Sequence, residues 1–399
     1  MLVAPGPIEG VRILDLTRVL AGPFATQLLA DLGAEVWKVE RPGEGDETRH
    51  IPPQDHGESH YFLSVNRNKK SLAIDLKNPA GRDLVLDLAR HTDVVVENFR
   101  PGVTGRLGLD YEAVRAVNSE VIYCSISAFG QSGPLSGRSA FDVAMQAMGG
   151  GMSVTGEPGG KPMRMGLPMA DLGTGLFAVV GVLAAIADRQ RTGKGQLVDV
   201  AMFDSMIGLL SQFAGRYFMT GEDTEPVGSG HPSIVPYGAY ETSDGYIVIA
   251  NLGEAFWPKI ARALGRPELG LDERYRTNAG RLQHRAELEA IVSAAVRQRT
   301  TAEWEAVFET DDVPHAPVMK PSQILSHPQT LARGMVTHAS HPLLGEIALT
   351  GRPIFFPRYQ GGQPDPPPLL GQHTDSVLGE VLGLSAERLA ALRSEGVIG

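Results

Sequence analysis

The chain has 399 residues and a net charge of −10, from 36 Lys and Arg against 46 Asp and Glu, and 42% of its residues are hydrophobic. This length predicts two or three domains, the single Cys124 excludes an intrachain disulfide and a multi-cysteine metal site, and the acidic balance argues against nucleic-acid binding. The first ten residues do not resemble a signal peptide, and the longest apolar run, 176–187, is shorter than the roughly 20 residues that cross a bilayer, so we expect a cytoplasmic enzyme with no membrane partner.

Apolar strands alternate with helices over the first 130 residues. The pattern predicts strands at 11–16, 35–40, 93–98 and 121–126 and helices at 24–32 and 80–90. Such alternation is typical of a parallel sheet with helices on both faces, so we expect an α/β fold with a Rossmann-like large domain. The turn after the first strand, Thr17–Pro23, lacks the G-x-G-x-x-G fingerprint, which argues against a dinucleotide.

The second half of the chain has a different pattern. A long apolar helix is predicted at 172–189 and a further helix at 203–217. Two strands joined at Ser243–Gly245 form a predicted β-hairpin, and more helical patterns follow it. The hairpin strands are 237–242 and 246–250, and the helices are 255–264, 283–297 and 301–309. We interpret 228–325 as a second, smaller α+β domain.

Asp171 is the strongest candidate for chemistry, because it stands at the start of the long apolar helix. As an N-cap it would only satisfy free backbone N–H groups. If it borders a cleft, the helix dipole and backbone donors would hold its carboxylate ionised, as a nucleophile with a low pKa. The sequence leaves both interpretations open.

Basic residues follow several predicted strands, at the edge where open α/β sheets bind ligands. Each could be a solvated surface charge, but together they would suit a phosphate-bearing ligand. They are Arg18, Arg41, Lys69, Lys70, Lys77, Arg100 and Arg106.

Two histidines have less specific surroundings. His231 lies in the loop 228–232 and is either an exposed turn residue or part of a binding loop or lid, while His373 is interpreted as a structural hydrogen-bonding residue. The chain contains neither H-E-x-x-H nor G-x-S-x-G, so we expect no metal and no α/β-hydrolase nucleophile.

A series of ordered motifs covers essentially the whole chain. It comprises Leu14–Thr17 with Ala21–Pro23, Gly33–Pro42, Asn68–Ser71 with Asp75–Lys77, Glu97–Gly102, Tyr123–Ser127 with Gly130–Pro134, Ala170–Leu172, Gly193–Gln196 and Pro368–Thr374. With these motifs the chain resembles the class III coenzyme A transferases of the CaiB/BaiF type. The resemblance implies an interlocked, ring-shaped homodimer. It also implies a large domain made of 1–205 and 346–399, with linkers at 206–227 and 326–345 on either side of the small domain.

The same resemblance implies a site and a mechanism. The family's catalytic carboxylate falls on Asp171, which would pass through an aspartyl anhydride and an aspartyl-CoA thioester. Coenzyme A is then a substrate, and no tightly bound cofactor is expected. By the resemblance, its contacts are Arg18, Val19, Arg41, Ile74, Lys77, Asn98, Phe99 and Arg106, and Tyr61 and Gln146 lie near the acyl pocket.

Segments 231–237 and 245–249 resemble the branch that moves coenzyme A from succinyl-CoA to dicarboxylic acids such as glutarate. The distal carboxylate of such an acceptor needs a cation, and Arg18, Arg164 and His231 are the candidates.

Two alternatives remain. The α-methylacyl-CoA racemases share the fold but use a His-Asp pair, which here aligns with Phe141-Asp142, and Phe cannot accept a proton. A non-catalytic CoA-binding protein is the other.

Overall fold

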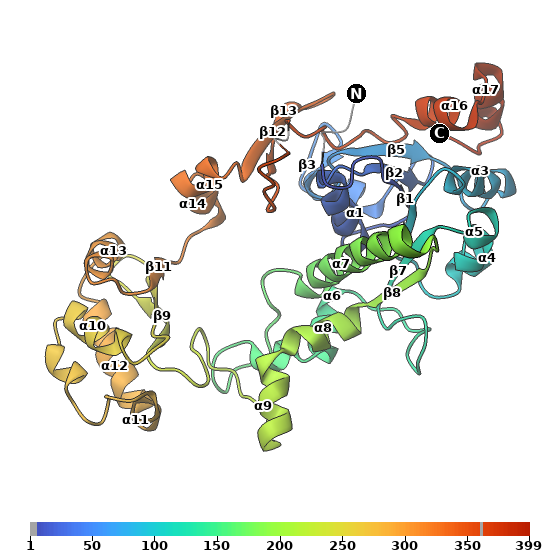
Figure 1. The fold of residues 1–399 in the computed structure, drawn as a ribbon. Helices are drawn as coiled ribbons and strands as arrows, with labels where there is room; N and C mark the ends of the chain where they lie inside the picture. Colours follow the sequence, from blue (N-terminus) through green and yellow to red (C-terminus); the bar gives the residue numbers. More distant parts are fainter. Residues whose placement is uncertain (1–5, 360–361) are drawn as a thin grey trace. The chain divides into compact units, whose positions relative to one another are not determined.

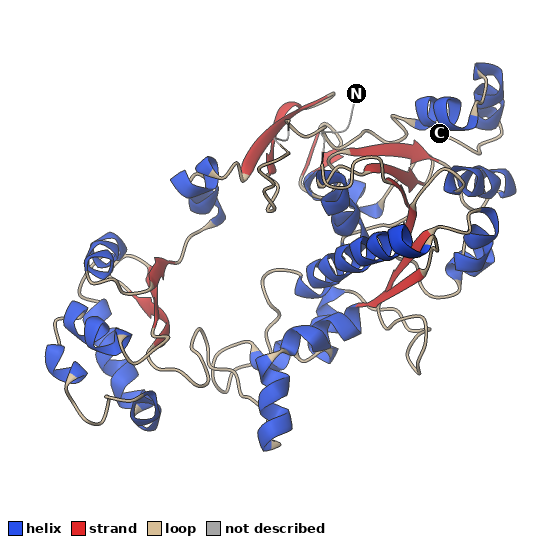
Figure 2. Cartoon of the chain, in the orientation of Figure 1, coloured by secondary structure: helices blue, strands red, loops and turns tan. Residues whose placement is uncertain are grey.

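The computed structural model describes residues 6–359 and 362–399. By their contacts these residues form two compact units (Figures 1 and 2). Among the described residues, the larger unit contains 6–150, 166–211, 328–359 and 362–399, and the smaller contains 151–165 and 212–327. The domain boundaries expected from the sequence stay a prediction.

The larger unit is built on a six-stranded parallel sheet with the order β5-β2-β1-β6-β7-β8. Its strands are β1 Arg12–Asp15, β2 Glu35–Glu40, β5 Lys69–Ala73, β6 Val94–Glu97, β7 Ile122–Ser127 and β8 Leu197–Ala201. The predicted α/β class and its four strands are confirmed, and β5 and β8 are additional. Successive strands are added on one side of β1 and then on the other, so the order of the sheet reverses between β1 and β6. In open α/β sheets, ligands bind at the carboxyl ends of the strands beside such a reversal.

Helices cover both faces of this sheet, as its apolar strands require. One face packs against helices α1 (Ala21–Asp31) and α7 (Met169–Thr192). The opposite face is covered by α3 (Pro79–Ala89), α5 (Tyr111–Val117), α16 (Thr374–Leu382) and α17 (Ala386–Ser394). The last two come from the C-terminus, so the chain returns to the larger unit.

Helix α7 is long and apolar enough to cross a membrane by length and composition. Its buried residues Ala178, Val182 and Ile186 belong to the hydrophobic core beneath the sheet. On its other side Leu176 and Val180 are 52% and 63% exposed. The helix is therefore a core element with one uncovered apolar face.

The helix predicted at 203–217 is divided in the structure. Helix α8 is Met202–Leu210 and α9 is Gln212–Thr220. Between them Ser211 has φ 44° and ψ −110°, a conformation that no helix continues through.

The smaller unit contains the predicted hairpin, extended by a third antiparallel strand. Its strands are β9 Tyr237–Glu241, β10 Tyr246–Ala250 and β11 His315–Pro317. The helices that supply the rest of its core are α10 Phe256–Ala263, α12 Arg285–Val296 and α13 Thr301–Thr310.

Shorter elements complete the two units. The strands are β3 Gln54–Asp55, β4 Glu58–Ser59, β12 Val336–His341 and β13 Gly345–Thr350. The helices are α2 His60–Ser64, α4 Val103–Leu107, α6 Asp142–Met148, α11 Asn278–Gln283, α14 Pro321–Leu325 and α15 Pro328–Ala332, and 3₁₀ turns cover Glu47–His50, Gly151–Val154 and Pro267–Gly270.

Candidate active site

The loops that follow β1 and β6 meet where the strand order reverses. The backbone N–H of Arg18 donates to Oδ1 of Asn98 at 2.8 Å, and Nδ2 of Asn98 donates to the carbonyl of Arg18 at 2.7 Å. The guanidinium of Arg18 also lies 5.0 Å from the ring centre of Phe99. These contacts fix the two loops to each other at the edge of the sheet that suits a ligand.

A pocket of about 520 Å³ opens beside these loops, and we call it the strand-end pocket. It brings together six of the eight residues expected to contact coenzyme A: Arg18, Arg41, Ile74, Lys77, Phe99 and Arg106. Three of its cations are paired, Arg18 with Glu47, Arg41 with Glu44 and Lys38 with Asp46. Within the described ranges, Lys77, Arg100 and Arg106 make no ion pair, so three cations face this pocket ready for an anionic ligand.

A second pocket, of about 370 Å³, contains Asp171, and we call it the Asp171 pocket. It also contains Val19 and Asn98, the other two residues expected to contact coenzyme A. Arg18, Glu47, Phe99 and Arg100 line both pockets. The two pockets therefore adjoin each other, so a ligand bound in the strand-end pocket lies next to the pocket that contains Asp171.

Asp171 lies in the first turn of α7, which begins at Met169 after the cap position Pro168. The N-cap interpretation is therefore wrong, because the helix starts earlier than the sequence predicted. The free N–H groups at the start of α7 instead donate to Asp142: its Oδ1 accepts from the N–H of Ala170 at 3.0 Å and from the N–H of Asp171 at 3.4 Å. The side chain of Asp171 is left to face its pocket.

The expectation of a low pKa for Asp171 is also wrong. Burial, and then the negative charge of Asp142, raise the pKa of Asp171 to about 7. Desolvation disfavours the charged form of a carboxyl group, and a second carboxylate nearby adds repulsion. A strongly shifted carboxyl group lining a pocket is a typical sign of a functional site.

Tyr61 and Gln146, expected near the acyl pocket, both lie close to this pair of carboxylates. Burial raises the pKa of Tyr61, and the charges of Asp171 and Asp142 raise it further, which places the phenol near them. The buried Gln146 donates from Nε2 to Oδ2 of Asp142 at 2.8 Å. It contacts the second carboxylate, and it is not among the residues lining the Asp171 pocket.

His231 and Arg164 belong to the smaller unit. The Nδ1 atom of His231 accepts from the N–H of Ser233 at 3.0 Å, and its ring packs edge-on against Tyr237. A role for His231 at the site stays a prediction.

Lys69 and Lys70 begin strand β5 and do not follow a strand, so the sequence placed them wrongly among the strand-end cations. Nζ of Lys69 is buried against Asp15 at 3.1 Å, and Nζ of Lys70 pairs with Glu35 at 2.6 Å. His373, interpreted as structural, accepts from the N–H of Ser71 at 3.3 Å through Nδ1.

Sequence reasoning overlooked several residues of the two pockets. Arg138 lines the Asp171 pocket, and Glu44 and Glu47 pair with cations of the strand-end pocket. The sequence singled out Asp142 only because it aligns with the His-Asp pair of the racemases. Its position at the start of α6 (Asp142–Met148) was the signal that could have pointed to a second carboxylate beside Asp171. Among the residues that the structure describes, no group of His, Cys, Asp and Glu could hold a metal ion.

Comparison with known proteins shows which family this chain matches. Residues 8–374 match the model of CoA-transferase family III. The succinyl-CoA:glutarate CoA-transferase of Mus musculus is 45% identical over 393 residues, covering 98% of this chain and 90% of that protein, and the protein of the same name from Homo sapiens is 42% identical over the same shares. The crystal structure of a CAIB/BAIF family protein from Brucella suis has a TM-score of 0.86 and 37% identity, covering 94% of this chain and all of that one.

Proposed function

The chain belongs to CoA-transferase family III, and we propose that it transfers coenzyme A from succinyl-CoA to a dicarboxylic acid such as glutarate, with Asp171 as the nucleophile. The observation that carries this proposal is the position of Asp171, in a pocket that adjoins a second one lined by free cations. The two mammalian relatives named above, each similar over nearly the whole chain, support succinyl-CoA and glutarate as the substrates.

Coenzyme A fits the strand-end pocket because it is a long polyanion. Arg forms paired hydrogen bonds with phosphate and Lys acts as a point charge, so Arg106 and Lys77 are suited to the phosphate groups. The net charge of −10 repels anions at long range, which leaves binding to these local cations. With its phosphates held there, the thioester end extends past Arg18 and Phe99 to Asp171.

The reaction then proceeds in four balanced acyl transfers. The Asp171 carboxylate attacks the succinyl thioester, the C–S bond breaks, and an aspartyl-succinyl anhydride forms with CoA thiolate. The thiolate attacks the aspartyl carbonyl, which releases succinate and leaves an aspartyl-CoA thioester. The acceptor carboxylate attacks this thioester to give a second anhydride and the thiolate again. Attack of the thiolate on the acceptor carbonyl forms the new acyl-CoA and restores the Asp171 carboxylate.

The elevated pKa suits this covalent role. With a pKa of about 7, roughly half of the Asp171 side chains are ionised at pH 7. A desolvated carboxylate is less stabilised than one in water, so its attack on a thioester loses less solvation. The neighbouring Asp142 carboxylate adds repulsion that is relieved when Asp171 becomes an uncharged anhydride or thioester.

The distal carboxylate of a dicarboxylic acceptor needs a cation close to Asp171. Of the three cations proposed from the sequence, Arg18 lines the Asp171 pocket, and Arg138 lines it as well. We therefore propose Arg18 and Arg138 as the partners of the distal carboxylate.

A homodimer, interlocked as in the related family, is the third part of the proposal. Leu176, Val180 and Leu209 on α7 and α8 are 52%, 63% and 42% exposed. Helices α7 and α8 pack against each other, and large exposed apolar patches are typical of protein interfaces, so the proposal assigns these residues to an interface with a second copy of the chain.

The decisive test incubates the enzyme with succinyl-CoA and one acid at a time, and measures the new acyl-CoA by chromatography. Glutarate should accept coenzyme A; the set also includes formate, oxalate, malate, mesaconate and carnitine. Turnover with formate or carnitine alone would contradict a dicarboxylate acceptor. Rapid α-deuteration of a 2-methylacyl-CoA in D₂O, without any acceptor acid, would instead identify a racemase.

The nucleophile is tested by Asp171→Ala, with Asp188→Ala near the other end of the same helix as the control. The first variant should lose transfer and lose the acyl-enzyme that hydroxylamine traps, while still binding coenzyme A. Normal turnover by Asp171→Ala would remove Asp171 from the mechanism.

A further inference from the structure

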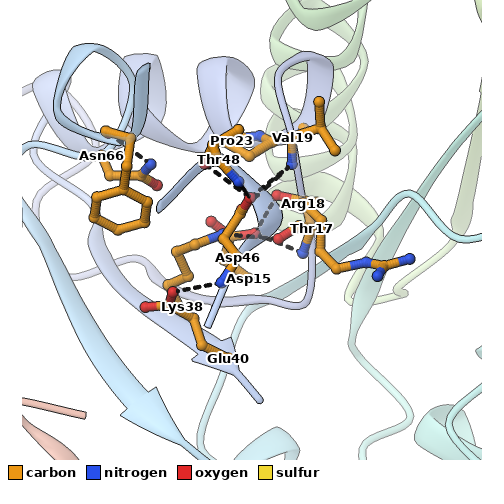
Figure 3. Close-up of polar contacts among 12 residues, drawn as sticks. Asp15, Thr17, Arg18, Val19, Pro23, Lys38, Glu40, Asp46, Thr48 and Asn66 are labelled. Carbon is orange, nitrogen blue, oxygen red and sulfur yellow. Dashed lines mark hydrogen bonds and ion pairs between the residues drawn. The ribbon is translucent and has the colours of Figure 1, made fainter. Parts of the chain in front are cut away.

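Charged side chains are buried inside the larger unit, on the face of the sheet that α1 covers (Figure 3). Asp15, Lys38 and Lys69 lie on three neighbouring strands, and their side chains are fully buried. Removing such charges from water costs several kcal/mol each unless partners replace the water. Because this cluster has a large desolvation cost and lies beside a candidate ligand pocket, we expect a functional role in addition to packing.

Lys38 and Asp46 form the ion pair of this cluster that reaches the loop after β1. Nζ of Lys38 lies 3.0 Å from Oδ2 of Asp46 and donates to the carbonyl of Thr17 at 2.8 Å. The N–H of Val19 points at the Asp46 carboxylate, 3.2 and 3.3 Å from its two oxygens. Thus one buried pair holds the loop at two backbone groups, one on each side of Arg18.

The conformation of Val19 explains why the loop needs this support. Val19 has φ 68°, in the left-handed region that β-branched residues rarely adopt. A non-glycine residue there costs roughly 1–2 kcal/mol. The hydrogen bond from Val19 to a charged acceptor is of the stronger kind, so the Asp46 carboxylate can offset that cost.

The loop held in this way separates the two pockets of the site. Thr17 and Arg18 line the strand-end pocket, and Arg18 and Val19 line the Asp171 pocket. If Val19 relaxed to a negative φ, the peptide units on both sides would rotate and displace Arg18. The path between the two pockets therefore depends on a conformation that the loop does not favour by itself.

We propose that Lys38 and Asp46 are positioning residues, which hold the loop Thr17–Leu20 in a strained conformation that completes the binding site for coenzyme A. This inference rests on the proposed function, because it presumes that coenzyme A occupies the strand-end pocket. Lys38 and Asp46 also line the strand-end pocket, and the proposal assigns them a role that they perform through the loop and not by binding the ligand themselves.

The test replaces both charges together, since removing one alone would leave the other buried without a partner. The double variant Lys38→Met/Asp46→Val substitutes apolar side chains of similar size. The matched control is Arg67→Met/Asp31→Val, which removes another buried ion pair of the same unit whose partners lie outside both pockets. Calorimetry measures the Kd for coenzyme A, and thermal unfolding measures the Tm of each variant.

We expect the first double variant to bind coenzyme A about 5- to 30-fold more weakly, which is the 1–2 kcal/mol of the left-handed conformation converted at 1.4 kcal/mol per tenfold. The control should bind as the wild type does. Equal affinity in the two double variants would overturn the proposal. Absence of coenzyme A binding by the wild type would instead refute the proposed function.

A second pair of measurements separates positioning from direct contact with the ligand. Glycine adopts positive φ without the penalty that valine carries, so in a Val19→Gly background the loop no longer depends on the buried pair. There the same two substitutions should weaken binding by less than about threefold, a coupling that a double-mutant cycle quantifies. A loss of equal size in both backgrounds would mean that Lys38 or Asp46 acts on the ligand directly, and would overturn the positioning role.

Discussion

The influence of Asp142 on the candidate nucleophile can be tested by Asp142→Asn. In the wild type, Oδ1 of Asp142 accepts from the N–H groups of Ala170 and Asp171 at the start of α7. An asparagine oxygen can accept the same two bonds, so the helix end stays satisfied. The substitution removes the negative charge and keeps these two bonds, and the Gln146 amide, which donates from Nε2 to Oδ2 in the wild type, must present its oxygen to the new amide group.

The size of the effect follows from the causes of the shift. The pKa of Asp171 rises from an ordinary 3.8 to about 7, burial being the larger cause and the charge of Asp142 the smaller. Asp142 thus accounts for less than half of the rise, which corresponds to under about 2 kcal/mol at 1.36 kcal/mol per pH unit. In the variant, the pKa of Asp171 should fall but stay nearer 7 than 3.8.

The assay is the pH dependence of kcat/KM for coenzyme A transfer, because this profile reports ionisation of the free enzyme. Since the ionised form of Asp171 attacks, kcat/KM of the wild type should rise with pH through a midpoint near 7. In Asp142→Asn the midpoint should move to lower pH, whereas the control Asp188→Asn should leave it in place. A midpoint that stays unchanged or moves upward in Asp142→Asn would refute the electrostatic reasoning.

Three other predictions concern stability, binding and assembly. The raised pKa of Asp171 means that the folded chain binds more protons than the unfolded chain between pH 3.8 and about 7, so its stability falls as pH rises through this window. Asp171→Asn should therefore raise the Tm at pH 8 and leave the Tm unchanged at pH 3. An equal change in Tm at both pH values would contradict this reasoning. Arg106→Ala should weaken coenzyme A binding by about 10- to 100-fold, the worth of a charged hydrogen bond, whereas Arg115→Ala, on the exposed side of α5, should not; calorimetry decides. Val180→Glu should convert the proposed dimer to monomers in light scattering, and a persisting dimer would place the interface elsewhere.

The local sequence pattern was sufficient for most of the sheet. Strands such as β6 and β7 are largely apolar, a property of the local sequence that does not depend on distant contacts. Strand β5 was missed because it begins with Lys69 and Lys70, which look solvated in sequence. Only its pairing with β2 and the partners of Lys69 make a strand of it.

For the candidate site too, some features could be predicted from the sequence and others depend on folding. The ordered motifs were enough to propose Asp171 and to select five cations that line the strand-end pocket, Arg18, Arg41, Lys77, Arg100 and Arg106, because residue type and order are properties of the sequence. They could not give the pKa of Asp171, which depends on burial and on Asp142, 29 residues earlier in the chain.

The charged residues show the same contrast between what the sequence predicts and what folding determines. By itself the sequence determined an acidic, single-cysteine α/β chain with a recognisable order of motifs. Folding settles which charges are buried as an ion pair, such as Lys38 and Asp46, and which stay exposed beside the strand-end pocket, such as Lys77 and Arg106. The physical reason is that desolvation and Coulomb interactions act between residues that folding brings together, and periodicity along the chain does not record those distances.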